Sequence, residues 1–483
     1  MNSGVEGPLT RTTFVFTIAT LVAAGPAAGQ STDSLPTAIQ EVVRVTAPVV
    51  ALTHVQVVDG TGAPPAADRT IVIEDGRIAA VGPAGEVEIP SGAEVLDLPG
   101  HTVIPGFVGL HDHTFYTTAG RRVQSTFSAP RLYLAGGVTT IRTTGSYHPY
   151  SELSLKRAID AGETPGPRIH VTGPYLTGGS GVSYMTQVST PEDARRVVAY
   201  WADEGATWFK AYTQISRAEL GAVIDEAHRR NLKVTGHLCS VSFREAVELG
   251  IDNLEHGFFT NTDYDPDKPA DTCPTDFRDA LLSVDLNGAD VQRTFDAMIE
   301  NGVAMTSTLA IYELVVPGRP AEIDPRVMAA LAPEAQADYL RSREEIAANA
   351  AESHWPELFP RAQAFEKAFV EAGGLLAAGV DPTGIGGALP GFGDQRNYEL
   401  LIEAGFAPPE AIRIMTLNGA TVLGEDDEYG SVEAGKLAEL AVIEGDPVAR
   451  PVEIRNVRLV FKDGLGYDSE KLIESVAGQV GIR

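Results

Sequence analysis

The chain has 483 residues, and 43% of them are hydrophobic, so it can bury a large core and is neither disordered nor fibrous. It carries 37 basic and 65 acidic residues, a formal charge of -28. This charge disfavours nucleic acid and anionic membrane surfaces as partners, and it is compatible with a site for divalent cations.

An apolar run at residues 14–24 lies between Arg11 and the small residues 26–29. The run is shorter than the roughly 20 residues of a membrane-spanning helix, so we interpret residues 1–29 as a signal peptide rather than an anchor. Residues 30–47 would then form a linker, and the protein would be exported, periplasmic or secreted. No later stretch is long and apolar enough for stable membrane insertion.

Both ends of the remaining chain, residues 48–102 and 426–483, contain short β-patterned runs separated by Gly and Pro turns. Between them, β-patterned runs alternate with helix-like segments, which is typical of repeated βα units. The eight predicted strands are 103–111, 138–144, 168–172, 208–212, 233–238, 253–256, 303–309 and 375–381. We therefore predict an α/β fold with a (β/α)8 TIM barrel over residues 103–425.

Helix-start signals occupy the gaps between these strands. Thr190 precedes Pro191 and two acidic residues, and Ser216 and Ser242 stand where the caps of the next two helices are expected. Two insertions, residues 261–283 and 312–371, follow the sixth and seventh strands. On a barrel they would rise from the face that carries active sites, either as pocket walls or as solvated additions.

The first predicted barrel strand ends in His111-Asp112-His113. Alternate side chains of an extended strand share a face, so the two imidazoles point the same way and form half of a metal site. Further donors end other predicted strands: Lys210, His237, His256 and Asp381. Nitrogen and oxygen donors of this kind suit Zn²⁺ or related divalent ions.

The phrase Pro105-Gly-Phe-Val-Gly-Leu-His-Asp-His113 and the order HxH, Lys, His, His, Asp resemble the amidohydrolase superfamily with a binuclear metal site. The phrases Gly236-His-Leu and Glu255-His-Gly resemble its imidazolonepropionase-like and Xaa-Pro dipeptidase (prolidase) branch. This resemblance covers nearly the whole mature chain. It implies that the two β-rich ends form one small composite β-sandwich domain around the termini of the barrel.

The resemblance also implies roles. His111, His113 and Asp381 would hold the deeper metal ion, and His237 and His256 the outer one. Lys210 would bridge both as a carboxylated lysine, formed with CO₂, since an ammonium group has no lone pair for a metal. A metal-bridging hydroxide would attack the amide, and Asp381 would carry the proton to the leaving amine.

Other candidate site residues are less constrained by the pattern. Tyr212 shares a strand face with Lys210, so it could meet the substrate or the developing oxyanion, or simply pack. His148 and Arg396 follow strands and could bind a substrate carboxylate, or be solvated. We interpret the loop 177–181 as part of the pocket, whereas structural roles are expected for His54, His101, His170, His228 and His354.

The chain has two cysteines, Cys239 and Cys273, and no CxxC pair, which disfavours a thiolate metal site. Both follow predicted strands on neighbouring loops. In an exported protein we expect a disulfide that tethers the first insertion, with two buried thiols as the alternative.

Three functions are compatible with these observations. The first is hydrolysis of a C–N bond in a dipeptide, an N-acyl amino acid or a similar small amide, with two divalent ions, Zn²⁺ being expected. The second is a mononuclear deaminase or imidazolone-type cyclic amide hydrolase on the same fold. The third is a non-catalytic binding relative, since fold does not imply function. The pattern leaves homo-oligomerisation open.

Overall fold

The computed structural model describes residues 1, 34–118, 120–179, 184–384 and 386–482. Apart from Met1, the predicted signal peptide lies outside the described residues, as do residues 180 and 181 of the predicted pocket loop. Within the part that is described, no helix is long and apolar enough to cross a membrane.

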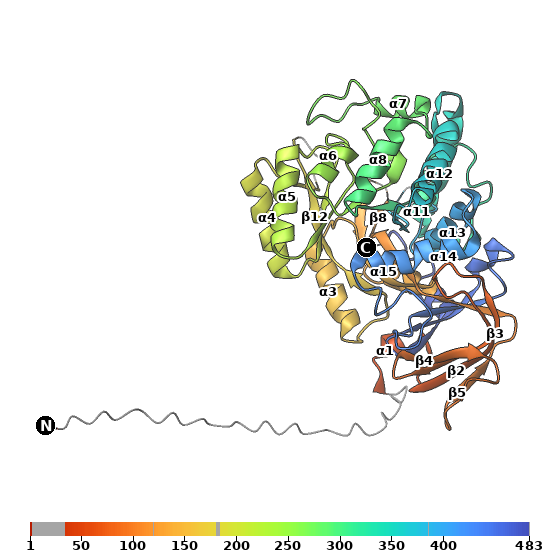
Figure 1. Cartoon of the computed structure of the whole chain (residues 1–483). Helices are drawn as coiled ribbons and strands as arrows, with labels where there is room; N and C mark the ends of the chain where they lie inside the picture. The colour runs from red at the N-terminus through yellow and green to blue at the C-terminus, as the bar shows by residue number, and fades with distance from the viewer. Residues whose placement is uncertain (2–33, 119, 180–183, 385, 483) are drawn as a thin grey trace.

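Strands from both chain ends share one sheet of nine strands at one end of the molecule (Figure 1). Its order is β1-β21-β20-β19-β6-β2-β3-β4, with β5 paired to β2. The strands are β1 (Val43–Val45), β2 (Val49–Val57), β3 (Ala66–Glu74), β4 (Arg77–Pro83), β5 (Glu94–Asp97), β6 (His101–Pro105), β19 (Leu440–Glu444), β20 (Val457–Lys462) and β21 (Leu465–Asp468). Leu52, Ile71 and Leu440 are fully buried in its apolar core. A two-layered sandwich and the exact domain boundaries remain predictions.

The middle of the chain forms parallel strands connected by helices, which confirms the mixed α/β class. One sheet has the order β11-β10-β7, and the other β13-β12-β14-β15-β16-β17-β18. The strands are β7 (Phe107–Asp112), β10 (Val138–Thr143), β11 (Arg168–His170), β12 (Thr172–Thr177), β13 (Thr186–Gln187), β14 (Trp208–Ala211), β15 (Lys233–Gly236), β16 (Asn253–Glu255), β17 (Ala304–Ser307) and β18 (Leu376–Ala378). The two ladders do not join into one closed sheet. Single links connect them: the N–H of Asp381 donates to the carbonyl of His111 at 2.8 Å, and Ser146 forms an isolated bridge with Pro174.

Two predicted strands were wrong in extent. Residues 103–111 divide at Gly106, so that Val103 belongs to β6 of the end sheet and Phe107 begins β7. Proline has no N–H to continue a ladder, and the N–H of Gly106 donates to the carbonyl of Glu439, the residue before β19 of the end sheet. Residues 168–172 likewise divide, because β11 pairs with β10 whereas β12 pairs with β14 and continues to Thr177. The other six strands lie within their predicted ranges.

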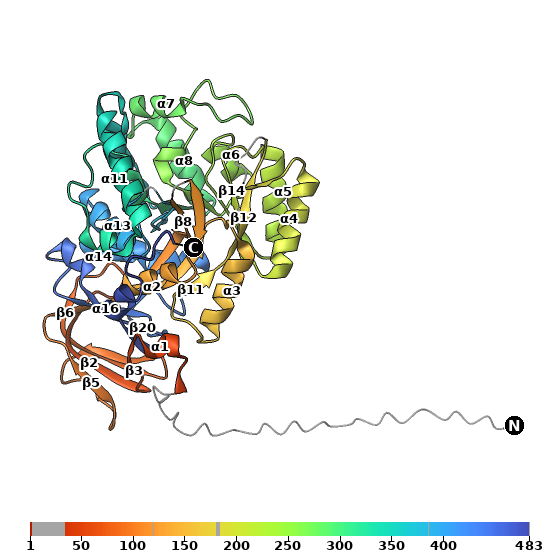
Figure 2. The same cartoon turned by 180° about the vertical axis from the view of Figure 1, so that it is seen from behind.

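Helices surround the parallel strands, as Figures 1 and 2 show from opposite sides. The connecting helices are α2 (Ser128–Ala135), α3 (Pro149–Asp160), α4 (Pro191–Glu204), α5 (Arg217–Arg229), α6 (Phe243–Glu248), α8 (Ala289–Glu300), α13 (Phe392–Glu403), α14 (Pro408–Met415) and α15 (Leu417–Leu423). Thr190 caps α4, and Ser216 and Ser242 form capping boxes on α5 and α6. These three predicted caps are therefore confirmed.

Both insertions contain helices. The first includes α7 (Phe277–Ser283), and the second runs from α9 (Leu309–Glu313) through α10 (Pro325–Ala330) and α11 (Pro333–Ala348) to α12 (Trp355–Glu371). Short helices α1 (Thr37–Gln40) and α16 (Ser469–Glu474) lie near the chain ends. A disulfide joins Cys239 to Cys273, with their Cα atoms 4.9 Å apart, so the predicted pairing is confirmed. It ties the first insertion to the segment that follows β15.

Candidate metal centre

The predicted donors come together at the carboxyl ends of the parallel strands. The rings of His111 and His256 lie 4.4 Å apart, as do those of His237 and His256. Asp381 Oδ1 lies 3.2 Å from His113 Nε2 and 3.6 Å from His111 Nε2. Lys210 Nζ lies 3.0 Å from His111 Nε2. Parallel strands end at one edge, which is why residues up to 270 positions apart in the chain share one cluster.

At this edge the backbone adopts conformations that are uncommon for residues other than glycine. His256 and Asp381 have φ values of 66° and 52°, in the left-handed region. Gly379 precedes Asp381, and a Cβ there would collide with the backbone of His111. Only glycine therefore lets β18 approach β7 closely enough to place Asp381 beside the two histidines of the first strand.

Hydrogen bonds orient two of the imidazoles. Nδ1 of His111 bonds to a Glu255 carboxylate oxygen at 2.7 Å, and Nδ1 of His256 to the Thr308 hydroxyl at 2.7 Å. In each ring Nε2 is left to face the cluster. His256 Nε2 is buried, makes no hydrogen bond within the described residues and lies 4.0 Å from Asp381 Oδ2. A buried ring nitrogen that makes no hydrogen bond and faces a carboxylate is suited to bind a metal ion.

Burial and nearby charges keep the histidines neutral and Asp381 ionised, which are the forms that bind a metal ion. Burial lowers the pKa of His111 and His113, the latter to about 4, and lowers those of His237 and His256 well below the ordinary value. Burial alone would raise the pKa of Asp381, but His111 and the other nearby basic groups hold it below its usual range. The imidazoles are therefore neutral and the carboxylate is anionic near pH 7.

These residues fit a divalent cation. Ligand atoms of His111, His256 and Asp381 all lie within 4.8 Å of one another. Neutral imidazole nitrogens with a carboxylate oxygen suit Zn²⁺ and related ions. Lys210 is buried beside them, and burial lowers its pKa to about 8, so a substantial fraction of its amine is unprotonated at mildly alkaline pH.

Glu255 is a site residue that sequence reasoning missed. It is completely buried and accepts hydrogen bonds from His111, from Arg142 Nη2 at 2.5 Å and from Asn253 Nδ2 at 3.0 Å. Burial would raise its pKa, but Arg142 and then His111 lower it to about 2. Its place beside His256 in the sequence was a signal, but its partners His111 and Arg142 lie more than 100 residues away.

A cavity of about 310 Å³ opens beside the donors, and Tyr212 lines it together with His237, Lys210 and Asp381. The ring of Tyr212 lies 4.7 Å from that of His237. Tyr175, which was not predicted, also lines the cavity, and its hydroxyl lies 3.4 Å from His113 Nε2. It was missed because the third strand was predicted to end at residue 172.

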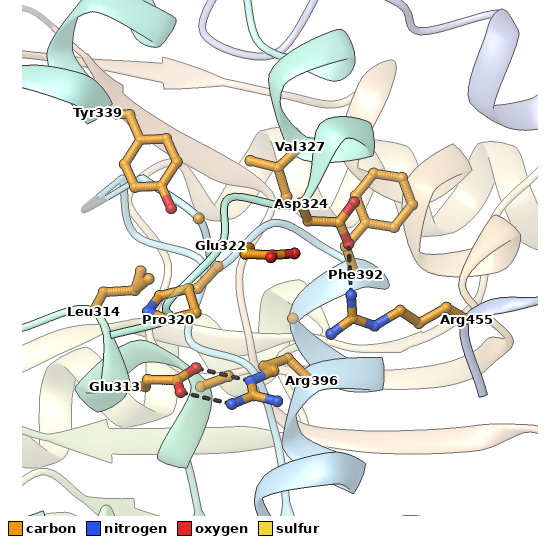
Figure 3. Close-up of a pocket in the computed structure, with 14 residues that line it drawn as sticks. Glu313, Leu314, Pro320, Glu322, Asp324, Val327, Tyr339, Phe392, Arg396 and Arg455 are labelled. Atoms are coloured by element: carbon orange, nitrogen blue, oxygen red, sulfur yellow. Dashed lines mark hydrogen bonds and ion pairs between the residues drawn. The ribbon is translucent and has the colours of Figure 1, made fainter. Parts of the chain in front are cut away.

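His148 and Arg396 are not brought to this cavity. His148 is exposed at the start of α3, where its ring contacts Tyr147. Arg396 lines a separate pocket of about 50 Å³, where Figure 3 shows its guanidinium bonded to Glu313. It also pairs with Glu399 at 2.5 Å, so its donors are engaged within the protein.

Histidines that we expected to be structural lie with carboxylates. His54 pairs with Asp68 at 2.8 Å and His228 with Asp252 at 2.9 Å. His170 lies 3.3 Å from Glu425. None of the three belongs to the donor cluster.

Comparison with known proteins places the chain in a family. The model of the amidohydrolase family matches residues 102–465. A dihydroorotase of Anaeromyxobacter dehalogenans is 36% identical over 120 residues, which are 23% of this chain and 26% of the relative. An enamidase of Eubacterium barkeri is 39% identical over 79 residues, 16% of this chain and 20% of the relative. The matches thus span about a quarter or less of these curated relatives.

Solved structures are similar over most of both chains. A candidate prolidase from Bifidobacterium longum shares 26% identity and superimposes with a TM-score of 0.62, covering 89% of this chain and 98% of that one. A Xaa-Pro dipeptidase with methionine in its active site shares 21% identity with a TM-score of 0.64, covering 87% and 100%. Because the family model extends over most of the sequence and includes every donor of the cluster, this chain belongs to the amidohydrolase family.

Proposed function

We propose that the protein is a metal-dependent hydrolase that cleaves the C–N bond of a small amide, such as a dipeptide or an N-acyl amino acid. The observation that carries the proposal is the buried cluster of neutral imidazoles around an anionic Asp381, beside a cavity large enough for a small molecule. We also propose that the parallel strands correspond to a (β/α)8 barrel, with the cluster at its catalytic face.

In this proposal His111, His113 and Asp381 would hold one divalent ion, and His237 and His256 would hold a second. Bound ions of this kind, Zn²⁺ being the expected one, supply a nucleophilic water at neutral pH and polarise the amide carbonyl. Lys210, which lies 3.0 Å from His111, would supply anionic oxygen ligands as a carbamate. Carbamate formation requires an unprotonated amine, and the lowered pKa of Lys210 provides it.

Asp381 serves as the proton carrier. Its low pKa keeps it anionic, so it can accept the proton of the attacking water and pass it to the leaving amine nitrogen. Tyr212 lines the cavity next to His237, where its hydroxyl can donate to the substrate oxygen on which charge develops. Glu255 and Thr308 act through the histidines that they orient.

A mononuclear deaminase or cyclic amide hydrolase is the second candidate. It is favoured by the compact group of His111, His256 and Asp381, which needs only one ion. A library of dipeptides, N-acyl amino acids and cyclic amides, incubated with metal-loaded protein, separates the candidates. We expect cleavage of linear amides with about two ions per chain. Cleavage confined to cyclic amides or amines, with one ion per chain, would replace our proposal by the second candidate.

We further propose that residues 1–29 direct export. The disulfide between Cys239 and Cys273 supports this proposal, because disulfides persist in oxidising compartments.

A further inference from the structure

The cavity beside the donor cluster contains one cationic side chain that the proposed mechanism does not use. Of its described lining residues, only Lys210 and Arg122 carry a lysine or arginine charge. Arg122 lies on β9 (Arg121–Gln124), which pairs antiparallel with β8 (Phe115–Thr118) directly after His113. The hairpin thus brings a guanidinium to the wall of the cavity.

The Arg122 side chain has no anionic partner among the described residues. Its neighbour Arg121 points away and pairs with Glu334 at 2.6 Å. Within the described part of the chain, the Arg122 side chain makes no ion pair and no hydrogen bond; its guanidinium lies over the Tyr184 ring, 3.4 Å from the centroid. Because this guanidinium lines the cavity and no carboxylate of the described chain engages it, its donors can bind an anion that enters the cavity.

The stacking on Tyr184 leaves the in-plane N–H donors of the Arg122 guanidinium free to bind an anion. A cation–π contact uses the flat face of the group, whereas its N–H donors lie in the plane and suit the two oxygens of a carboxylate. A series of packed aromatic side chains also fixes the position of this plane. The Tyr184 ring packs 6.0 Å from that of Tyr175, whose hydroxyl contacts His113. Arg122 is therefore positioned relative to the donor cluster.

A second unpaired arginine adds positive charge on the same side. Arg278 of α7 packs against the rings of Phe277 and Trp355, and its buried Nε has no partner among the described residues. The Trp355 ring lies 5.6 Å from that of Tyr312, which in turn lies 5.4 Å from the ring of His256 in the donor cluster. The disulfide at Cys273 ties the Arg278 insertion to the segment beyond His237. This local positive field opposes the overall charge of -28, which repels anions.

We propose that Arg122 binds a carboxylate of the substrate, and that the enzyme therefore prefers amides with a free carboxyl group to neutral amides. This inference rests on the proposed function and narrows its substrate class. Arg122 contacts the part of the substrate that does not react, so it determines specificity and has no part in holding metal ions.

The test uses matched substrates. N-acetyl amino acids and dipeptides are each supplied as the free acid and as the carboxamide, and kcat/KM is measured for the metal-loaded wild type, Arg122→Gln, Arg122→Lys and Arg121→Gln. We expect wild type to prefer the free acids and Arg122→Gln to lose about 10- to 100-fold on the acids but little on the carboxamides. Arg122→Lys should restore part of the preference, and Arg121→Gln should match wild type.

Two further readouts separate the possible failures. Metal content and thermal melting of Arg122→Gln should equal those of wild type, which shows that the variant folds and retains its donor cluster. If wild type cleaves carboxamides as well as acids, or if the preference survives in Arg122→Gln, the inference about Arg122 is overturned and the proposed function stands. If no acid or carboxamide is cleaved, the proposed function itself fails and the inference falls with it.

Discussion

Replacing Glu255 by glutamine tests the network that orients the first histidine. Glu255 and Arg142 are both fully buried, and the Arg142 guanidinium has no other carboxylate partner among the described residues. Removing the negative charge leaves Arg142 buried and uncompensated, which costs about 3 to 5 kcal/mol. Domains are stable by only about 5 to 15 kcal/mol, so this is a large part of the total.

The same substitution should weaken metal binding. Glu255 fixes His111 so that Nδ1 faces the carboxylate and Nε2 the cluster, and losing such a partner typically lowers metal affinity about 10- to 100-fold. Urea denaturation of the metal-free protein measures the first effect. Competition with a chelator measures the second, and the two are thereby separated.

Two further variants separate the loss of the buried charge pair from the general effect of replacing a buried glutamate. Glu366→Gln is the matched control, since Glu366 is equally buried but hydrogen-bonded only to Ser307, and burial raises its pKa to about 8, so little charge is removed. Adding Arg142→Met to Glu255→Gln should recover much of the lost stability without recovering metal affinity. If Glu255→Gln equals wild type in both stability and metal affinity, Glu255 neither compensates the charge of Arg142 nor orients His111 for metal binding.

Three other predictions follow from the structure. The pKa of Glu366 is about 8 in the folded protein against 4.5 ordinarily, so the folded state keeps a proton that the unfolded chain releases. The free energy of unfolding should therefore fall with rising pH across this window by up to about 1.4 kcal/mol per unit relative to Glu366→Gln, and parallel urea curves for the two proteins would contradict it. Non-reducing peptide mapping should find Cys239 linked to Cys273, and two alkylatable thiols in undisturbed protein would refute the linkage. Reduction of the disulfide should raise KM by a larger factor than that by which it lowers metal content. Protein recovered from its native host should begin near Gln30, as read by intact mass, and a retained residue 1 would refute export through a cleaved signal.

The donors could be predicted from the sequence because each lies at or just beyond the end of a short apolar run that forms a parallel strand. His237, His256 and Asp381 all stand just beyond the last residue of such a run, and parallel strands bring their carboxyl ends to one edge. Local pattern and topology together therefore indicate the cluster without any knowledge of distances.

Other site features depend on tertiary contacts that no local pattern contains. Arg396 looked suited to a substrate carboxylate, yet it is engaged by Glu313, 83 residues away. The charged partners of Glu255, His111 and Arg142, come from other strands. Arg122 belongs to a hairpin that was not predicted. The division at Gly106 was missed because the apolar run continues without interruption across Pro105, although β6 before it and β7 after it belong to different sheets.

The amount of metal bound when Lys210 is replaced tests the central proposal most directly. An ammonium group would repel divalent ions, whereas a carbamate attracts them and can bridge two. Elemental analysis of wild type and Lys210→Ala, purified with bicarbonate and zinc, should find about two ions per chain in wild type and fewer in the variant. Amide hydrolysis should be largely lost in the variant, and short carboxylic acids should restore part of it. Equal metal content and equal turnover in the two proteins would contradict the two-metal account and leave a mononuclear site built on His111, His113, His237 and Asp381.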